Sequence, residues 1–239
     1  MLMRPWSSIP IHDCQEPLQA LPVQLQRIEP HPYAALGAPY GAGGCPFRLR
    51  SGVLERLLLA QEHLAARDAD VQLAIFDAWR PLAVQRYMVE HSIAAECRSR
   101  ALDPAVDSPQ RQAVLADVAR FWAPPSNDPA TPPPHSTGAA VDLTLASTSG
   151  NLLDMGSAID AIGSVSEPDH FLERGEQCAD AAERHMLLIW HERRVLLRNA
   201  MAAAGFAQHP NEWWHFSWGD QLWAWRTGER QAVYGRSGC

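Results

Sequence analysis

Apolar residues recur at helical spacing in four stretches of the chain. After Ser51, leucines at positions 54, 57, 58 and 64 follow the pattern of one helix face, and Ser51 itself is a suitable N-cap. Pro81 suits the first turn of a second helix. The predicted helices cover residues 51–67, 81–97, 110–122 and 182–204.

Shorter runs between these helices predict strands. Residues 71–76 form a mostly apolar run that is typical of a buried strand, and residues 139–145 alternate between the two faces of a strand. Two aromatic-rich segments, 213–218 and 222–225, predict a hairpin that turns at Gly219-Asp220.

Proline and glycine mark the segments without regular structure. Residues 1–45 predict an irregular N-terminal arm with one strand, and residues 146–182 predict a long irregular loop. Residues 123–134 hold six prolines and predict an extended loop beside a cleft. Because the motifs on both sides of this loop need each other, we expect one domain over 1–239, with a motif-bearing core at about 50–225.

The charges and cysteines exclude several classes of protein. All 20 lysine-or-arginine positions are arginine, so a Schiff-base lysine and a phosphate-loop lysine are both excluded. The net charge of −7 disfavours a nucleic-acid partner. The five cysteines are odd in number and widely spaced, which indicates neither a disulfide framework nor a zinc knuckle.

The apolar content of the chain indicates where in the cell the protein is expected. Residues 1–10 lack the apolar stretch of a secretory signal. No segment reaches the roughly 18 apolar residues that a membrane span needs. We therefore expect a cytoplasmic protein with no membrane partner, whereas the sequence is silent on the oligomeric state.

Two segments offer candidate metal ligands. His135 opens a segment in which Gly138 permits a tight bend and Asp142 lies on the following strand. This arrangement suits an imidazole and a carboxylate on one metal ion. It equally suits a loop histidine and an aspartate that caps a turn, and spacing alone does not decide between the two.

The second segment is Glu212-Trp213-Trp214-His215. On a regular strand, residues 212 and 215 point to opposite faces, so a common site requires a local turn. The alternative is a plain hairpin in which the tryptophans serve the core.

Together these segments supply the groups of a zinc hydrolase. His135, Asp142 and His215 are two imidazoles and one carboxylate, the ligand types of a catalytic zinc with an open position. Zinc lowers the pKa of its water towards ~7, and a nearby carboxylate, for which Glu212 is the candidate, can remove the proton. Arg80, between a strand and a proline-started helix, is a candidate to stabilise an oxyanion, although a lone arginine more often forms a surface salt bridge.

The three segments, in this order, resemble the D-alanyl-D-alanine dipeptidase family of zinc peptidases. That family has arginine before proline after a strand, then histidine and aspartate seven apart, then Glu-x-x-His near the C-terminus. Residues 154–157, with Asp160 following, resemble its substrate-binding loop. The resemblance covers about residues 50–220.

The resemblance implies one zinc ion per chain and a small dipeptide substrate. His135, Asp142 and His215 would hold the zinc, and Glu212 would act as general base. Arg80 would stabilise the tetrahedral intermediate, while Asp160 would receive the amino group of the dipeptide. Ser157 and Trp214 are further expected substrate contacts. The implied fold is α+β, a mostly antiparallel central sheet flanked by helices, as in the hedgehog and D,D-peptidase group.

This sequence departs from the family pattern at Pro133, where the family often carries a serine, and residues 1–45 match it poorly. We therefore assign no site residue in the N-terminal arm. Two alternatives stay open. One is a D,D- or L,D-carboxypeptidase of the same fold that acts on peptidoglycan peptides, and the other is a zinc-binding module without catalysis.

Overall fold

The computed structural model describes residues 4–41 and 44–237, so Cys239 and the start of the predicted arm lie outside the described residues. Its centre is a five-stranded sheet in the order β2-β4-β5-β7-β6. The strands are β2 (Gln26–Arg27), β4 (Val71–Asp77), β5 (Ala140–Ser147), β6 (Ala207–Gln208) and β7 (His215–Ser217). Only the β2–β4 pair is parallel, which confirms the predicted α+β class with a mostly antiparallel sheet.

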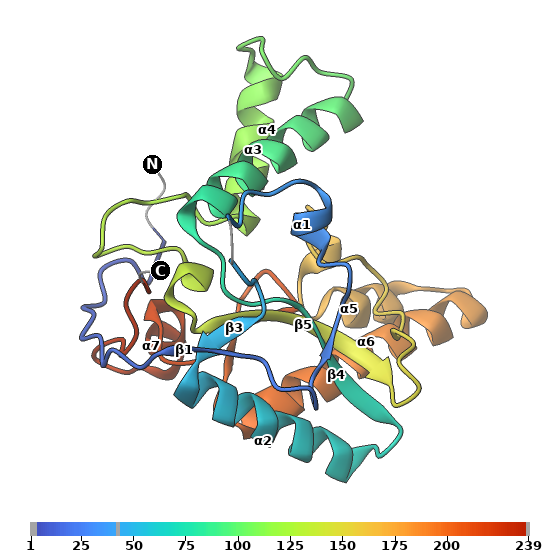
Figure 1. Ribbon diagram of the computed structural model, residues 1–239. Helices are drawn as coiled ribbons and strands as arrows, with labels where there is room; N and C mark the ends of the chain where they lie inside the picture. Colours follow the sequence, from blue (N-terminus) through green and yellow to red (C-terminus); the bar gives the residue numbers. More distant parts are fainter. Residues whose placement is uncertain (1–3, 42–43, 238–239) are drawn as a thin grey trace.

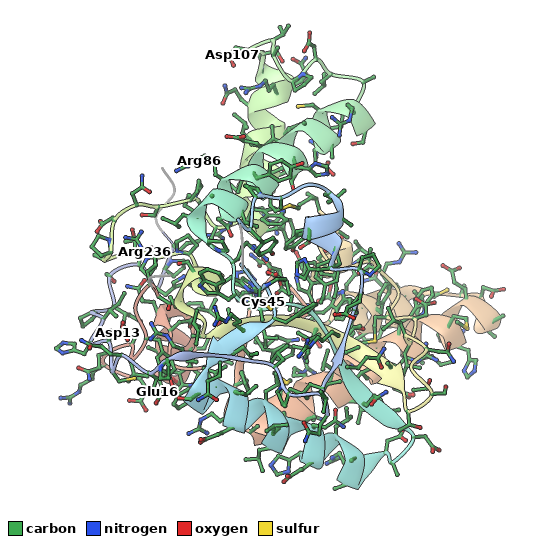
Figure 2. The ribbon with its side chains drawn as sticks, in the orientation of Figure 1. Asp13, Glu16, Cys45, Arg86, Asp107 and Arg236 are labelled. Atoms are coloured by element: carbon green, nitrogen blue, oxygen red, sulfur yellow. The ribbon has the colours of Figure 1, made fainter. Side chains whose placement is uncertain are left out.

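Helices cover the sheet and extend beyond it (Figure 1). They are α1 (Pro32–Ala35), α2 (Ser51–Arg67), α3 (Leu82–Ser99), α4 (Pro109–Phe121), α5 (His170–Gln177), α6 (Ala181–Ala203) and α7 (Gln221–Thr227). The four predicted helices are confirmed as α2, α3, α4 and α6, to within two residues at each end. Helices α3 and α4 form a hairpin that projects from the body, with Asp107 at its tip (Figure 2). None of the described helices is long and apolar enough to cross a bilayer.

Strand periodicity separates a core face from a polar face on the central sheet. Leu73 and Ile75 of β4 and Leu143 and Leu145 of β5 are fully buried in the core cluster, which they share with residues of α2 and α6. The alternate positions must point to the opposite face of the sheet, and Asp142 is one of them. The packing of the core therefore decides on which side a polar site can form.

The predicted C-terminal hairpin is wrong. Residues 221–227 form helix α7, because the Asp220 side chain accepts a hydrogen bond from the Trp223 amide and Gly228 ends the helix in the left-handed region at φ 77°. The hairpin instead joins β6 to β7. The predicted loop 146–182 is also partly wrong, since it contains α5.

The N-terminal arm is more regular than predicted. It contributes β1 (Leu18–Ala20), which pairs with β3 (Arg48–Arg50), as well as β2 and α1. Ile11 bridges Ala232, so the beginning and the end of the described chain lie side by side. This packing carries N-terminal side chains back to the polar face of the sheet.

Candidate active site

Three polar residues form a row across adjacent strands. Asp77 at the end of β4 is the register partner of Asp142 on β5, and Asp142 is the register partner of His215 on β7. Partners on neighbouring antiparallel strands share a face at close range. A bulge between Ile75 and Asp77 turns Asp77 to the polar face. The sheet register thus assembles a site from segments that are far apart in the sequence.

His135 reaches this row from a short 3-10 turn, η1 (Pro134–Thr137), that precedes β5. Gly138 ends the turn at φ 72°, and a Cβ there would lie 2.3 Å from Leu18, so the bend requires glycine. The Nδ1 atom of His135 lies 2.7 Å from the Ala78 carbonyl oxygen, which fixes it as the N–H donor. Its Nε2 atom is therefore free to bind a metal.

The donor atoms of His135, Asp142 and His215 all lie within 4.8 Å of one another, and all three residues are buried. Nε2 of His135 faces Nδ1 of His215 at 3.1 Å, and each nitrogen lies close to a carboxylate oxygen of Asp142, at 3.2 and 3.0 Å. The other nitrogen of His215 lies 3.3 Å from the Ser217 hydroxyl. Two imidazoles with their outer nitrogens occupied and one carboxylate are a donor set that fits zinc.

Glu212 lies in the loop of the β6–β7 hairpin, and this loop supplies the turn that the sequence left open. Its Oε2 lies 3.7 Å from His215 Nδ1. Its Oε1 is buried 3.4 Å from His209 Nδ1 and has no hydrogen-bond partner within residues 4–41 and 44–237. Burial raises the pKa of Glu212 well above its usual range, and the charge of Asp142 adds to the effect. A buried carboxylate with a raised pKa beside a candidate metal site is suited to accept a proton and pass it on.

Arg80 lies beside Asp142, one of the candidate metal ligands, and is held by Asp77. Its Nε and Nη2 atoms donate to one oxygen of Asp77 at 2.9 and 2.7 Å, and Nη2 also lies 3.2 Å from Asp142. The guanidinium packs against the rings of Tyr33 and Trp122, at 4.9 and 5.0 Å from their centroids. Arg80 is therefore a fixed, buried cation at the site rather than a surface salt bridge.

Asp160 faces the same space. It accepts a hydrogen bond of 2.7 Å from the Tyr33 hydroxyl, which in turn accepts one from Arg80. Burial and, next to it, the charge of Asp142 raise the pKa of Asp160 to about 7, against the opposing effect of Arg80. Its backbone is left-handed at φ 65°, a strained conformation that is often found at functional sites.

The two other predicted substrate contacts, Trp214 and Ser157, lie in different cavities. Trp214 is buried and lines the same cavity as the metal ligands. Ser157 lines a neighbouring cavity instead, and its hydroxyl accepts hydrogen bonds from Arg194 and from the Trp213 indole, both 2.9 Å. The structure therefore brings together every predicted site residue except Ser157.

Several residues of the cavity were missed by sequence reasoning. The cavity wall includes Arg4, Trp6 and His209, and Tyr33 contacts two of its groups. His31 donates from Nε2 to Asp77 at 3.0 Å, because its Nδ1 accepts from the Ala34 amide. Of these, only His209 carried a local signal, its position three residues before Glu212.

Comparisons with known proteins agree on one family. The family model described as Peptidase_M15, D-ala-D-ala dipeptidase, matches residues 26–232. A D-alanyl-D-alanine dipeptidase of Synechocystis sp. is 43% identical over 98% of this chain and 97% of its own length. The D-alanyl-D-alanine dipeptidase of Escherichia coli is 31% identical over 66% of this chain and 61% of its own. A solved zinc-bound D,D-pentapeptidase from a vancomycin resistance cassette aligns over 93% of this chain and 95% of its own, at 15% identity and a TM-score of 0.45.

Proposed function

This chain belongs to the D-Ala-D-Ala dipeptidase family of peptidases, and we propose that it is a zinc metallopeptidase that hydrolyses the dipeptide D-Ala-D-Ala to two D-alanines. The names of its relatives support the substrate. The convergence of His135, Asp142 and His215 supports the metal.

The proposed mechanism assigns metal binding to three residues and proton transfer to Glu212. His135, Asp142 and His215 would hold zinc, which supplies Lewis-acid chemistry that polarises a carbonyl and acidifies water. Glu212 takes the proton from the attacking water and later gives it to the leaving amine.

Arg80 and Asp160 would act on the substrate itself. Arg80 is a fixed donor, and one of its Nη1–H groups has no acceptor among the described residues after Gln85 accepts the other at 3.0 Å. That donor would stabilise the oxyanion that forms when the carbonyl is attacked. Asp160, beside Tyr33, would bind the free amino group of the dipeptide, and Trp214 would form part of the wall.

One observation carries the proposal. Glu212 is a buried carboxylate whose Oε1 lies 3.4 Å from His209 Nδ1 and has no hydrogen-bond partner among the described residues, and whose Oε2 lies 3.7 Å from His215, one of the three convergent donors. Leaving a buried acceptor unpaired costs stability. A bound water or substrate group at that point would satisfy it.

The test compares Glu212→Gln with a matched variant, Glu229→Gln, at an exposed glutamate. Alanine release is measured from D-Ala-D-Ala, L-Ala-L-Ala and a pentapeptide that ends in D-Ala-D-Ala, with and without chelator. We expect Glu212→Gln to lower kcat by about 10²- to 10⁴-fold with zinc content unchanged, and Glu229→Gln to behave as the parent protein. Normal turnover in Glu212→Gln would refute the mechanism.

The same assay addresses the alternatives. Cleavage of the pentapeptide would reassign the chain to the carboxypeptidases. Zinc binding without release from any peptide would indicate a module that lacks catalysis.

A single domain over 1–239 stays a prediction, and the contribution of residues from Arg4 to His215 to one cavity supports it. A cytoplasmic location also stays a prediction. Limited proteolysis and cell fractionation test these two points.

A further inference from the structure

The N-terminal arm supplies part of the active-site wall. Arg4 and Trp6 line the cavity together with Glu212. Trp6 is 7% exposed and packs edge-on against the His209 ring at 5.6 Å. Both residues precede the region that the family model matches, 26–232.

Carbonyl oxygens at the end of α4 hold Arg4 in place. Its Nη1 donates to the Arg120 carbonyl at 3.0 Å, and its Nη2 donates to the Ala119 and Trp122 carbonyls at 2.7 and 3.1 Å. The last carbonyls of a helix lack partners within the helix and attract cations. Nε–H and one Nη1–H of Arg4 find no acceptor among residues 4–41 and 44–237.

The two arginines of the cavity differ in their counter-ions. Arg80 is paired with both Asp77 and Asp142. Arg4 forms no ion pair with any described residue, and burial lowers its pKa while the nearby Glu212 opposes this effect. A partly buried cation without a carboxylate partner is costly unless a ligand supplies the negative charge.

The two ends of a free dipeptide carry opposite charges, and the cavity offers an opposite charge for each. Asp160 lies with Tyr33 and Arg80, whereas Arg4 lies with Trp6 on the side of Glu212. We propose that Arg4 binds the substrate's terminal carboxylate and so restricts cleavage to bonds whose leaving residue has a free carboxyl group. This inference rests on the proposed function of the same site.

The experiment compares D-Ala-D-Ala with its C-terminal amide, in which a neutral carboxamide replaces the carboxylate. The parent protein should cleave the acid with a kcat/KM at least about 10-fold above that of the amide, because a charge-assisted hydrogen bond is lost. Arg4→Met should lower kcat/KM for the acid by about 10- to 100-fold and leave that for the amide within about 3-fold. Arg4→Lys should keep part of the preference for the acid.

Arg236→Met is the matched control. Arg236 also holds a loop through carbonyl oxygens, those of Ser126 and Asn127, but it does not line the cavity. We expect its preference for the acid to equal that of the parent.

The outcomes separate the inference from the proposed function. If the parent cleaves neither substrate, the proposed function fails. If the parent cleaves acid and amide equally well, only the role of Arg4 fails, whether or not the variants fold. An equal loss for both substrates in Arg4→Met would also overturn that role, because it would mean that Arg4 acts through Glu212 or through the fold.

Discussion

Asp77 is the residue through which the sheet fixes Arg80, and Asp77→Asn tests this link. The carboxylate is fully buried and accepts two hydrogen bonds from Arg80, one from His31 at 3.0 Å and one from Tyr40 at 3.2 Å. Burial opposes its charge, yet the pKa of Asp77 is lowered because Arg80 and His31 outweigh burial. The amide has nearly the same shape but carries no charge and presents N–H groups to these donors.

The expected loss of stability follows from the four hydrogen bonds that Asp77 accepts. Removing one partner of a buried ion pair costs about 3–5 kcal/mol, because the other charge stays buried. Asp142 still faces Arg80, so we expect the free energy of unfolding to fall towards the lower end of that range. Because Arg80 loses its fixed orientation, we expect kcat to fall by about 100-fold, with a smaller change in KM.

Urea denaturation of zinc-loaded protein gives the change in unfolding free energy, and steady-state assays give kcat and KM. Asp107→Asn at the exposed tip of the α3–α4 hairpin (Figure 2) is the control, with an expected change within about 0.5 kcal/mol. The reasoning is wrong if Asp77→Asn is as stable as the parent. If stability falls while kcat stays unchanged, Asp77 supports the fold without orienting Arg80 for catalysis.

Two further predictions concern the segment 154–160. Asp160→Asn should lower kcat/KM for D-Ala-D-Ala by about 10- to 100-fold, and it should make the chelator-treated protein more stable than the parent at pH 8. The pKa of Asp160 is raised to about 7 in the folded protein, whereas it is about 4 in the unfolded chain. The parent therefore loses stability as the pH rises from about 4 towards 7. If the difference in unfolding free energy between Asp160→Asn and the parent does not grow between pH 5 and 8, the prediction is wrong. Gly156→Ala should lower the free energy of unfolding by at least about 2 kcal/mol, because φ is 82° and a Cβ would lie 2.3 Å from the Phe171 ring. Gly150→Ala, at φ 92° with nothing within 4 Å, should lose only about 1 kcal/mol, and equal losses in urea denaturation would exclude the steric argument.

The sequence by itself determined the elements whose signals are local. The leucine pattern predicts α2 at residues 51–67 as observed, although the N-cap is Arg50 rather than Ser51 and makes no side-chain capping hydrogen bond. The alternating segment 139–145 forms most of β5. His135, Gly138 and Asp142 lie within one short segment, so the bend and the strand that bring the two candidate metal ligands together are encoded there. Helix α7 shows the limit of pattern reasoning, since a cap at Asp220 outweighs the strand preference of the tryptophans that follow.

Tertiary structure alone decided which distant side chains share the site. The register of β4, β5 and β7 places Asp77, Asp142 and His215 in one row, and register depends on the packing of both sheet faces rather than on any single strand. The arm brings Arg4 to the cavity wall through contacts with α4, and it brings Tyr33 against Asp160, which also lines the cavity. No sequence pattern within residues 1–45 predicts these contacts. They form only when chain segments more than a hundred residues apart pack together.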